Sequence, residues 1–141
     1  MREEQLKALS EASRVTKKDG IILVAYCMNE YSVLTYGFKE NHIKESLAAG
    51  KLSEDFQVLS QEEDLYRYMR MDDINELNAE MGLTRMKIIS PDGPSDFMRP
   101  VLNAMDEETF ELFVKYHLSV CERPDLIGAG SHTLDILRNT K

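Results

Sequence analysis

The sequence lacks tryptophan, holds only two cysteines among its 141 residues, and contains no tract rich in glycine, serine or proline. Cys27 and Cys121 lie far apart and form no CxxC or CxxH pattern, so the usual spacing of a structural zinc site is absent. We expect both thiols to be reduced and mostly buried in a cytoplasmic protein. Without a linker-like tract or an internal repeat, residues 1–141 are expected to form one domain.

Long apolar runs and an excess of basic charge are also missing. No apolar run approaches the roughly 20 residues that a helix needs to cross a bilayer, and the charged first residues do not resemble a signal peptide. The 17 Lys and Arg residues are outnumbered by 25 Asp and Glu, which gives a formal net charge of −8. Because an acidic surface repels phosphate groups, we expect neither a nucleic acid nor a membrane as partner.

What the sequence does contain is typical of a globular protein, with 43% hydrophobic and 30% charged residues. Leu6, Leu9 and Val15 recur at helical spacing and predict a first helix, which Asp19 and Gly20 end. The next segment, residues 21–26, is apolar at both odd and even positions. Such a run predicts a central strand that is covered on both faces, as in the parallel sheets of α/β proteins.

Residues 29–82 are predicted to form a helical insert. The S-x-x-E pattern of Ser60 and Glu63 is that of a capping box, and it predicts a helix that carries Leu65. Asp72 is expected to cap a second helix, which the next glycine ends.

Two further strands are predicted near the end of the sequence, over residues 83–90 and 131–139. In the second of these, Leu134 and Ile136 are expected on one face, with Thr133, Asp135 and Leu137 on the other. Asp135 therefore requires either an exposed face or a cationic partner such as Arg99, because an unpaired buried carboxylate is costly.

Helices are predicted between these two strands. Residues 97–105 are expected to be helical, with a bend or restart at Pro100. A longer helix is predicted to begin at Asp106, with the apolar stripe expected in the core. That stripe comprises Phe110, Phe113, Val114, His117, Leu118 and Cys121. Helices and strands thus mix along one chain, which indicates an α/β fold.

The segment LSEASRVTKKDGIILVAY resembles a signature of class I S-adenosylmethionine-dependent methyltransferases, in which a helix leads into the fifth strand of a seven-stranded sheet. The resemblance is carried by Glu11, Ala12, Arg14, Val15, Lys17 and Gly20. The sequence departs from the pattern at Lys18 and Asp19, where the family has proline and glycine. The segment YHLSVCERPDLIGAGSHTLDILRN is similar to the end of bacterial members that carry a helical insert. The resemblance implies a partial Rossmann-like fold, with a three-stranded sheet equivalent to strands 5-7-6 of the family.

The family's cofactor-binding half has no counterpart in this sequence. No Gly-rich loop stands at a strand-to-helix turn, and Gly128 and Gly130 are better interpreted as part of a loop. The resemblance therefore implies the substrate-side half of an enzyme that uses S-adenosylmethionine, with no cofactor bound by this chain alone. Because residues 21–26 would then form a strand with one unpaired edge, we expect a homodimer or a partner that supplies the missing half. The alternative is a non-catalytic dimerisation or ligand-binding module derived from that fold.

The resemblance also implies where a small-molecule methyl acceptor would bind. The loop after the first strand, the insert and the C-terminal strands would form the pocket, with Tyr26, Cys27, Asn29 and Tyr36 as candidate substrate-binding residues. For the aromatic residues, packing in the core is the alternative. Arg99 is a candidate for binding an anionic acceptor, with a surface ion pair as the alternative. His132, at the start of the last strand, is the candidate catalytic base. For His117 and Cys121, packing in a core stripe is favoured over metal binding.

Overall fold

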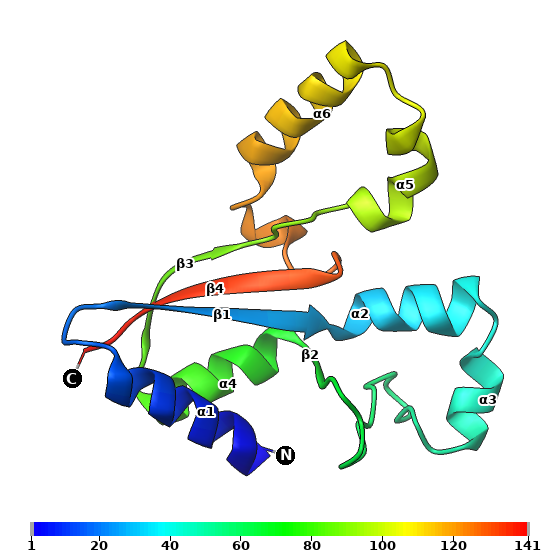
Figure 1. The fold of residues 1–141 in the computed structure, drawn as a ribbon. Coiled ribbons are helices and arrows are strands. Elements are labelled where there is room, and N and C mark those ends of the chain that lie inside the picture. Colours follow the sequence, from blue (N-terminus) through cyan, green and yellow to red (C-terminus); the bar gives the residue numbers. More distant parts are fainter. Residues whose placement is uncertain (1, 141) are drawn as a thin grey trace.

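The computed structural model describes residues 2–140, in which helices and strands alternate along the chain (Figure 1). This arrangement confirms the α/β class. In chain order the elements are α1 (Arg2–Val15), β1 (Ile21–Met28), α2 (Asn29–Ser32), the π-helix η1 (Val33–Lys39), α3 (Ile43–Ala48), β2 (Tyr68–Met69), α4 (Met71–Met81), β3 (Thr84–Ile89), α5 (Ser95–Asn103), α6 (Glu107–Val120), the 3₁₀-helix η2 (Pro124–Leu126) and β4 (His132–Arg138). Among these residues, no helix is long and apolar enough to cross a membrane.

The strands form one mixed sheet in the order β2-β1-β4-β3. The last strand, β4, lies between β1 and β3 and is antiparallel to both. The expectation of three strands is wrong, because residues 68–69 add a short parallel strand beside the end of β1. This fourth strand pairs only with Cys27 and Met28, so most of the outer edge of β1 has no neighbouring strand among the described residues.

The hydrophobic core lies on one face of the sheet, where α1 and α4 pack (Figure 1). Alternate residues of β1 point into it, and β4 contributes Leu137 from the directly opposite position to Ile22. The buried core side chains are Leu9, Ile22, Tyr26, Met28, Met69, Ile74, Leu77, Leu83 and Leu137. Burying each large aliphatic side chain contributes about 1.5–3 kcal/mol, so this single layer carries most of the hydrophobic stabilisation.

The opposite face of β1 is open, contrary to the expectation that both faces would be covered. Leu23 is 62% exposed, whereas the adjacent Ile22 is 6% exposed. Figure 1 shows α5 and α6 standing away from the sheet beyond β3, so they leave this face uncovered. The apolar residues at both odd and even positions therefore predicted the strand correctly, but one face of that strand is exposed and not covered.

Two predictions in the insert need correction. The capping box predicted at Ser60 does not form a helix: residues 61–67 are turns and irregular chain, and Leu65 is exposed. Helix α4 is present, but Asp73 and not Asp72 caps its N-terminus. The Asp73 carboxylate accepts a hydrogen bond from the Arg70 backbone N–H at 2.8 Å. The glycine that ends α4 adopts a left-handed conformation with φ of 63°, which favours glycine.

The helices between β3 and β4 form as predicted, but they are not buried. Pro100 lies inside α5 without ending it. Asp106 caps α6 by accepting from the Thr109 N–H at 3.0 Å. The apolar stripe of α6 was expected in the core, yet no residue of this helix is buried. Val15, expected on the apolar side of α1, is also exposed.

Candidate functional site

The candidate site lies where β1 ends, β4 begins and the chain turns after β3. Cys27, near the end of β1, is directly opposite His132, the first residue of β4. The antiparallel pairing puts both side chains on the open face of the sheet, with Cβ atoms roughly 5 Å apart. The turn that follows β3 brings Asp92 to the same place.

A histidine and a carboxylate form the centre of this site, which we call the His132–Asp92 dyad. The distance from His132 Nδ1 to Asp92 Oδ2 is 2.7 Å, and Asp92 Oδ1 accepts from the His132 backbone N–H at 3.3 Å. The Ser131 hydroxyl also donates to Asp92. Because an ionised carboxylate only accepts hydrogen bonds, Nδ1 carries the proton and Nε2 is left as the basic nitrogen. The His132 side chain is 50% exposed, so Nε2 is accessible to a ligand.

A second carboxylate group, Asp96 in the first turn of α5, lies beside the dyad. Arg99 forms an ion pair with it, and the hydrogen bond from the Arg99 guanidinium holds the pKa of Asp96 below its usual range. Tyr31 from α2 also hydrogen-bonds to Asp96. Partial burial and then the Asp96 charge raise the pKa of Tyr31, so its hydroxyl stays protonated and can donate.

Cys27 completes a Cys–His–Asp grouping, but its thiol is not activated. Partial burial raises the pKa of Cys27, and the nearby Asp92 charge raises it further. A nucleophilic cysteine requires the opposite shift, because only the thiolate attacks. Cys27 therefore forms part of the wall of the site, and His132 is the group suited to proton transfer.

An apolar cavity of about 370 Å³ lies next to the turn that carries Asp92. It lies between α5, α6 and the turn before β4, and its lining includes Ser90, Gly93, Phe97, Tyr116, Leu126 and Gly130. Gly130 lines the cavity and lies close to Asp92. A methyl group on this residue would lie 2.9 Å from the Gly93 carbonyl oxygen and 3.4 Å from Asp92 Oδ1. The cavity can hold an apolar molecule beside the turn that carries Asp92.

Tyr26 and Tyr36 lie outside this site. The Tyr26 side chain points into the core on the opposite face of the sheet, and its buried hydroxyl has no hydrogen-bond partner. Burial, assisted by the Asp135 charge, raises the pKa of Tyr26 to about 12. Tyr36 stacks on His42 with ring centroids 4.4 Å apart and lines a separate hollow in the insert.

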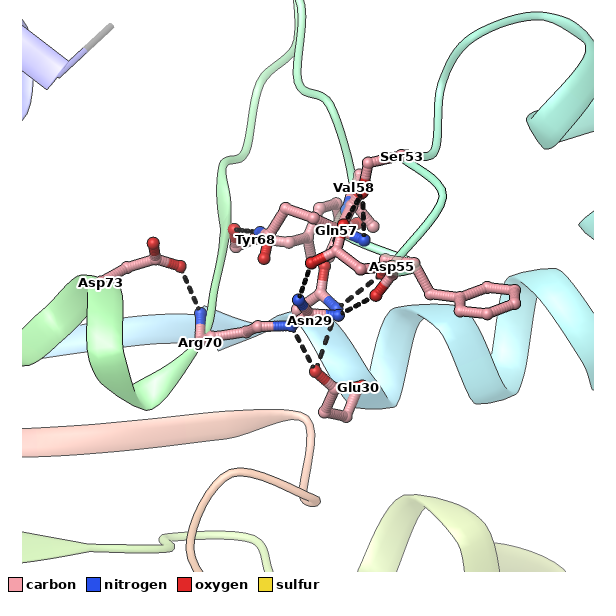
Figure 2. Close-up of polar contacts among 10 residues, drawn as sticks. Asn29, Glu30, Ser53, Asp55, Gln57, Val58, Tyr68, Arg70 and Asp73 are labelled. Carbon is pink, nitrogen blue, oxygen red and sulfur yellow. Dashed lines mark hydrogen bonds and ion pairs between the residues drawn. The ribbon is translucent and has the colours of Figure 1, made fainter.

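Asn29, another predicted substrate-binding residue, holds the insert in place (Figure 2). Its fully buried side chain accepts from the Val58 N–H at 2.8 Å and donates to the Phe56 carbonyl oxygen at 3.0 Å. Arg70 strengthens the same junction through hydrogen bonds to Glu30 at 2.7 Å and to the Asp55 carboxylate at 2.9 Å. With its amide engaged in this way, Asn29 has a structural role.

Asp135 has a cationic partner, but that partner is Arg85 and not Arg99. The Arg85 guanidinium binds both carboxylate oxygens at 2.8 Å, and Asn78 donates to Oδ2 at 2.7 Å. These contacts compensate for the complete burial of Asp135. Arg99 instead pairs with Asp96 near the dyad.

His117 and Cys121 belong to the cavity lining rather than to a metal centre. The His117 Nε2 lies 3.1 Å from the Pro91 carbonyl oxygen, and its ring stacks on Phe113. Within residues 2–140, no group of three or more His, Cys, Asp and Glu side chains is arranged to hold a metal ion. Both cysteines are free and half-buried.

The structure thus brings together Cys27, Arg99 and His132, and separates them from Tyr26, Asn29 and Tyr36. Sequence reasoning missed Asp92 and Asp96. The rule that selected His132, that polar residues at strand ends meet at a site, applies equally to Asp92, which follows β3 by three residues. No model of a known protein family matches this chain, and no curated protein matches it either.

Proposed function

We propose that this chain is the substrate-side half of a class I S-adenosylmethionine-dependent methyltransferase. The observation that carries the proposal is the strand order, in which β4 lies antiparallel between β1 and β3. In the family that the sequence resembles, the final strand inserts in this way between strands five and six. The segments that carry the resemblance, around α1 and β1 and around β4, are the ones that form this arrangement.

The outer edge of β1 supports the same proposal. A strand with unpaired backbone groups and apolar side chains invites pairing with another strand. Only two residues of β1 are paired on this side, so the edge offers a position for the family's fourth strand and the cofactor-binding half beyond it.

The described residues of this chain do not themselves fit the cofactor. Gly128 and Gly130 precede a strand, and the Gly130 position is already crowded by the Gly93 carbonyl oxygen. A Gly-rich loop that leads from a strand into a helix, as the cofactor requires, is not formed within residues 2–140. The contribution of this chain is therefore to hold the acceptor and to take its proton.

His132 is the proposed general base. An oxygen or nitrogen acceptor that gains a methyl group must lose a proton, and His132 Nε2 is the nitrogen that Asp92 leaves free to accept it. Asp92 orients the imidazole ring and stabilises its protonated form, as a carboxylate does in other histidine–carboxylate pairs. The cavity next to the turn that carries Asp92 would hold the apolar part of the acceptor.

Calorimetry with S-adenosylhomocysteine tests the absence of a cofactor site in the chain alone. We expect no heat of binding to the 141-residue chain. Micromolar binding would contradict the proposal, because it would require a cofactor site within this half.

The coding region before the codon for Met1 provides the positive test. We expect it to encode, in frame, a Gly-rich methyltransferase loop, and the joined polypeptide to bind S-adenosylhomocysteine. In that polypeptide, His132→Ala should lower kcat by about 10²–10⁴-fold, the usual contribution of a positioned base, without changing the affinity for S-adenosylhomocysteine. His42→Ala is the matched control, because His42 stacks on Tyr36 away from the dyad and should leave kcat unchanged.

The second candidate is a non-catalytic dimerisation or ligand-binding module. The apolar cavity and the unburied α6 favour it, since neither requires a cofactor half. A native start codon with no methyltransferase motif before it would support this module over the enzyme.

A further inference from the structure

Half of the residues of α6 are apolar, yet none of its residues is buried. Leu118 is 67% exposed, and Phe110 and Leu112 are also exposed. The apolar side of a surface helix normally packs against the core of its own protein. The exposed surface of α6 therefore indicates a contact with another molecule.

One row on α6 combines three exposed apolar residues. Phe110, Val114 and Leu118 follow one another at intervals of four residues, so they line one side of the helix and turn slowly around it. His117 follows Phe110 by seven residues and therefore lies on the same side as that residue, where it contacts the turn after β3 through its hydrogen bond to Pro91. Val114 and Leu118 lie farther round the helix, and all three apolar side chains remain exposed.

The charges of α6 determine which orientation of a second α6 helix fits this row. Glu107, Glu108 and Glu111 lie in the first half of the helix, whereas Lys115 lies in the second half. Two parallel copies would place like charges together. Two antiparallel copies would place the acidic half of one beside the basic half of the other.

We propose that α6 is the contact surface of a symmetric homodimer in which two copies of the helix pack antiparallel. A two-fold axis near Val114 puts Phe110 of each copy opposite Leu118 of the other, and brings Glu111 close to Lys115 across the interface. Such a self-complementary patch is what an isologous dimer requires. The proposal is independent of the methyltransferase assignment.

The position of α6 favours a second copy over the proposed cofactor half. That half would join the sheet at the outer edge of β1, whereas α5 and α6 follow β3 at the other edge. Figure 1 shows α6 projecting away from the rest of the molecule, so that a second copy can approach it.

The dimer is expected to be weak. A helix of 14 residues is about 21 Å long, and two such helices bury less than the roughly 1,200 Å² of a standard interface. We therefore expect the association to depend on protein concentration.

Sedimentation velocity over a concentration series tests the dimer. The unmodified chain should shift from monomer to dimer as its concentration rises, and Leu118→Asp should raise the dissociation constant at least about tenfold. A chain that stays monomeric throughout would overturn the proposal, as would a dimer that Leu118→Asp leaves intact.

Charge reversal tests the antiparallel orientation. Glu111→Lys and Lys115→Glu should each raise the dissociation constant by about fivefold to tenfold, because each creates two like-charge contacts in the symmetric dimer. The double variant should restore the original value. Glu63→Lys, in the turn region of the insert, makes the same change of charge as Glu111→Lys and should have no effect. Far-ultraviolet circular dichroism of each variant verifies folding, and failure of the double variant to recover would overturn the antiparallel arrangement.

Discussion

At the residue scale, one hydrogen bond determines which nitrogen of His132 can act as a base. Asp92 binds Nδ1, so the basic lone pair is on Nε2 of a side chain that is half exposed. Without that carboxylate the ring would be free to rotate and to exchange tautomers. Asp92 is therefore as important to the proposed proton transfer as the histidine itself.

A different carboxylate, Asp135, is expected to determine stability. Asp135→Asn keeps the shape of the side chain but leaves the Arg85 guanidinium, which is 28% exposed, without its counter-charge. Breaking such a largely buried pair from one side should lower the free energy of unfolding by about 3 kcal/mol. Urea denaturation measures this change.

The control for Asp135→Asn is Glu122→Gln, which removes an exposed ion pair with Lys87. Exposed pairs contribute at most about 1 kcal/mol, so this variant should unfold close to the unmodified chain. Equal losses in the two variants would show that burial of Asp135 has no special energetic role.

At the element scale, the junction around Asn29 should hold the insert to the end of β1. Asn29→Ala leaves the Val58 N–H and the Phe56 carbonyl without their partner (Figure 2). Each unsatisfied group costs about 1–3 kcal/mol, so we expect the two groups together to lower stability by roughly 2–6 kcal/mol. Limited proteolysis should show faster cleavage within residues 49–67 than in the unmodified chain.

Gln61→Ala is the matched control for the junction. The Gln61 side chain donates to the Leu59 carbonyl oxygen at an exposed position in the same segment. Cleavage of this variant should follow that of the unmodified chain. If Asn29→Ala were cleaved no faster than this control, the junction would not be what orders the insert.

The sequence correctly predicted the helices and strands that are determined by residues within the element itself. The apolar run at residues 21–26 and the alternation after Ser131 identified β1 and β4, and Asp106 identified the start of α6. The predicted helix at Ser60 failed because a capping pattern stabilises a helix only when an apolar side can be buried, and Leu65 is exposed. Strand β2 could not be predicted, since its two residues form a strand only by pairing with β1.

The candidate site was only partly predictable for the same reason. His132 was identified from its place at the start of a strand. Its partnership with Asp92 depends on the pairing of β3 with β4, which brings the two residues together across a long stretch of chain. The separation of Asn29 from the site also depends on a distant contact, with the loop that contains Val58.

At the scale of the whole molecule, the sheet has one covered and one open face. Substitution of adjacent residues of β1, one on each face, should therefore change the free energy of unfolding by different amounts. Leu23→Lys should change the free energy of unfolding by less than about 1 kcal/mol, because the leucine is already exposed. Ile22→Lys places a charge in the core and should abolish cooperative unfolding. Thermal unfolding monitored by circular dichroism distinguishes the two variants, and a Leu23→Lys variant as damaged as Ile22→Lys would mean that the open face is covered in solution.

The central position of β4 also governs the order in which the protein can fold. Ile21 pairs with Arg138, so the main sheet contact joins segments far apart in the sequence. Strands β1 and β3 are synthesised before β4, so neither can complete its pairing in the sheet until β4 has been made. During synthesis on the ribosome, the apolar strand β1 therefore emerges long before β4, with which it shares most of its pairing, and in this interval its unpaired apolar segment favours aggregation.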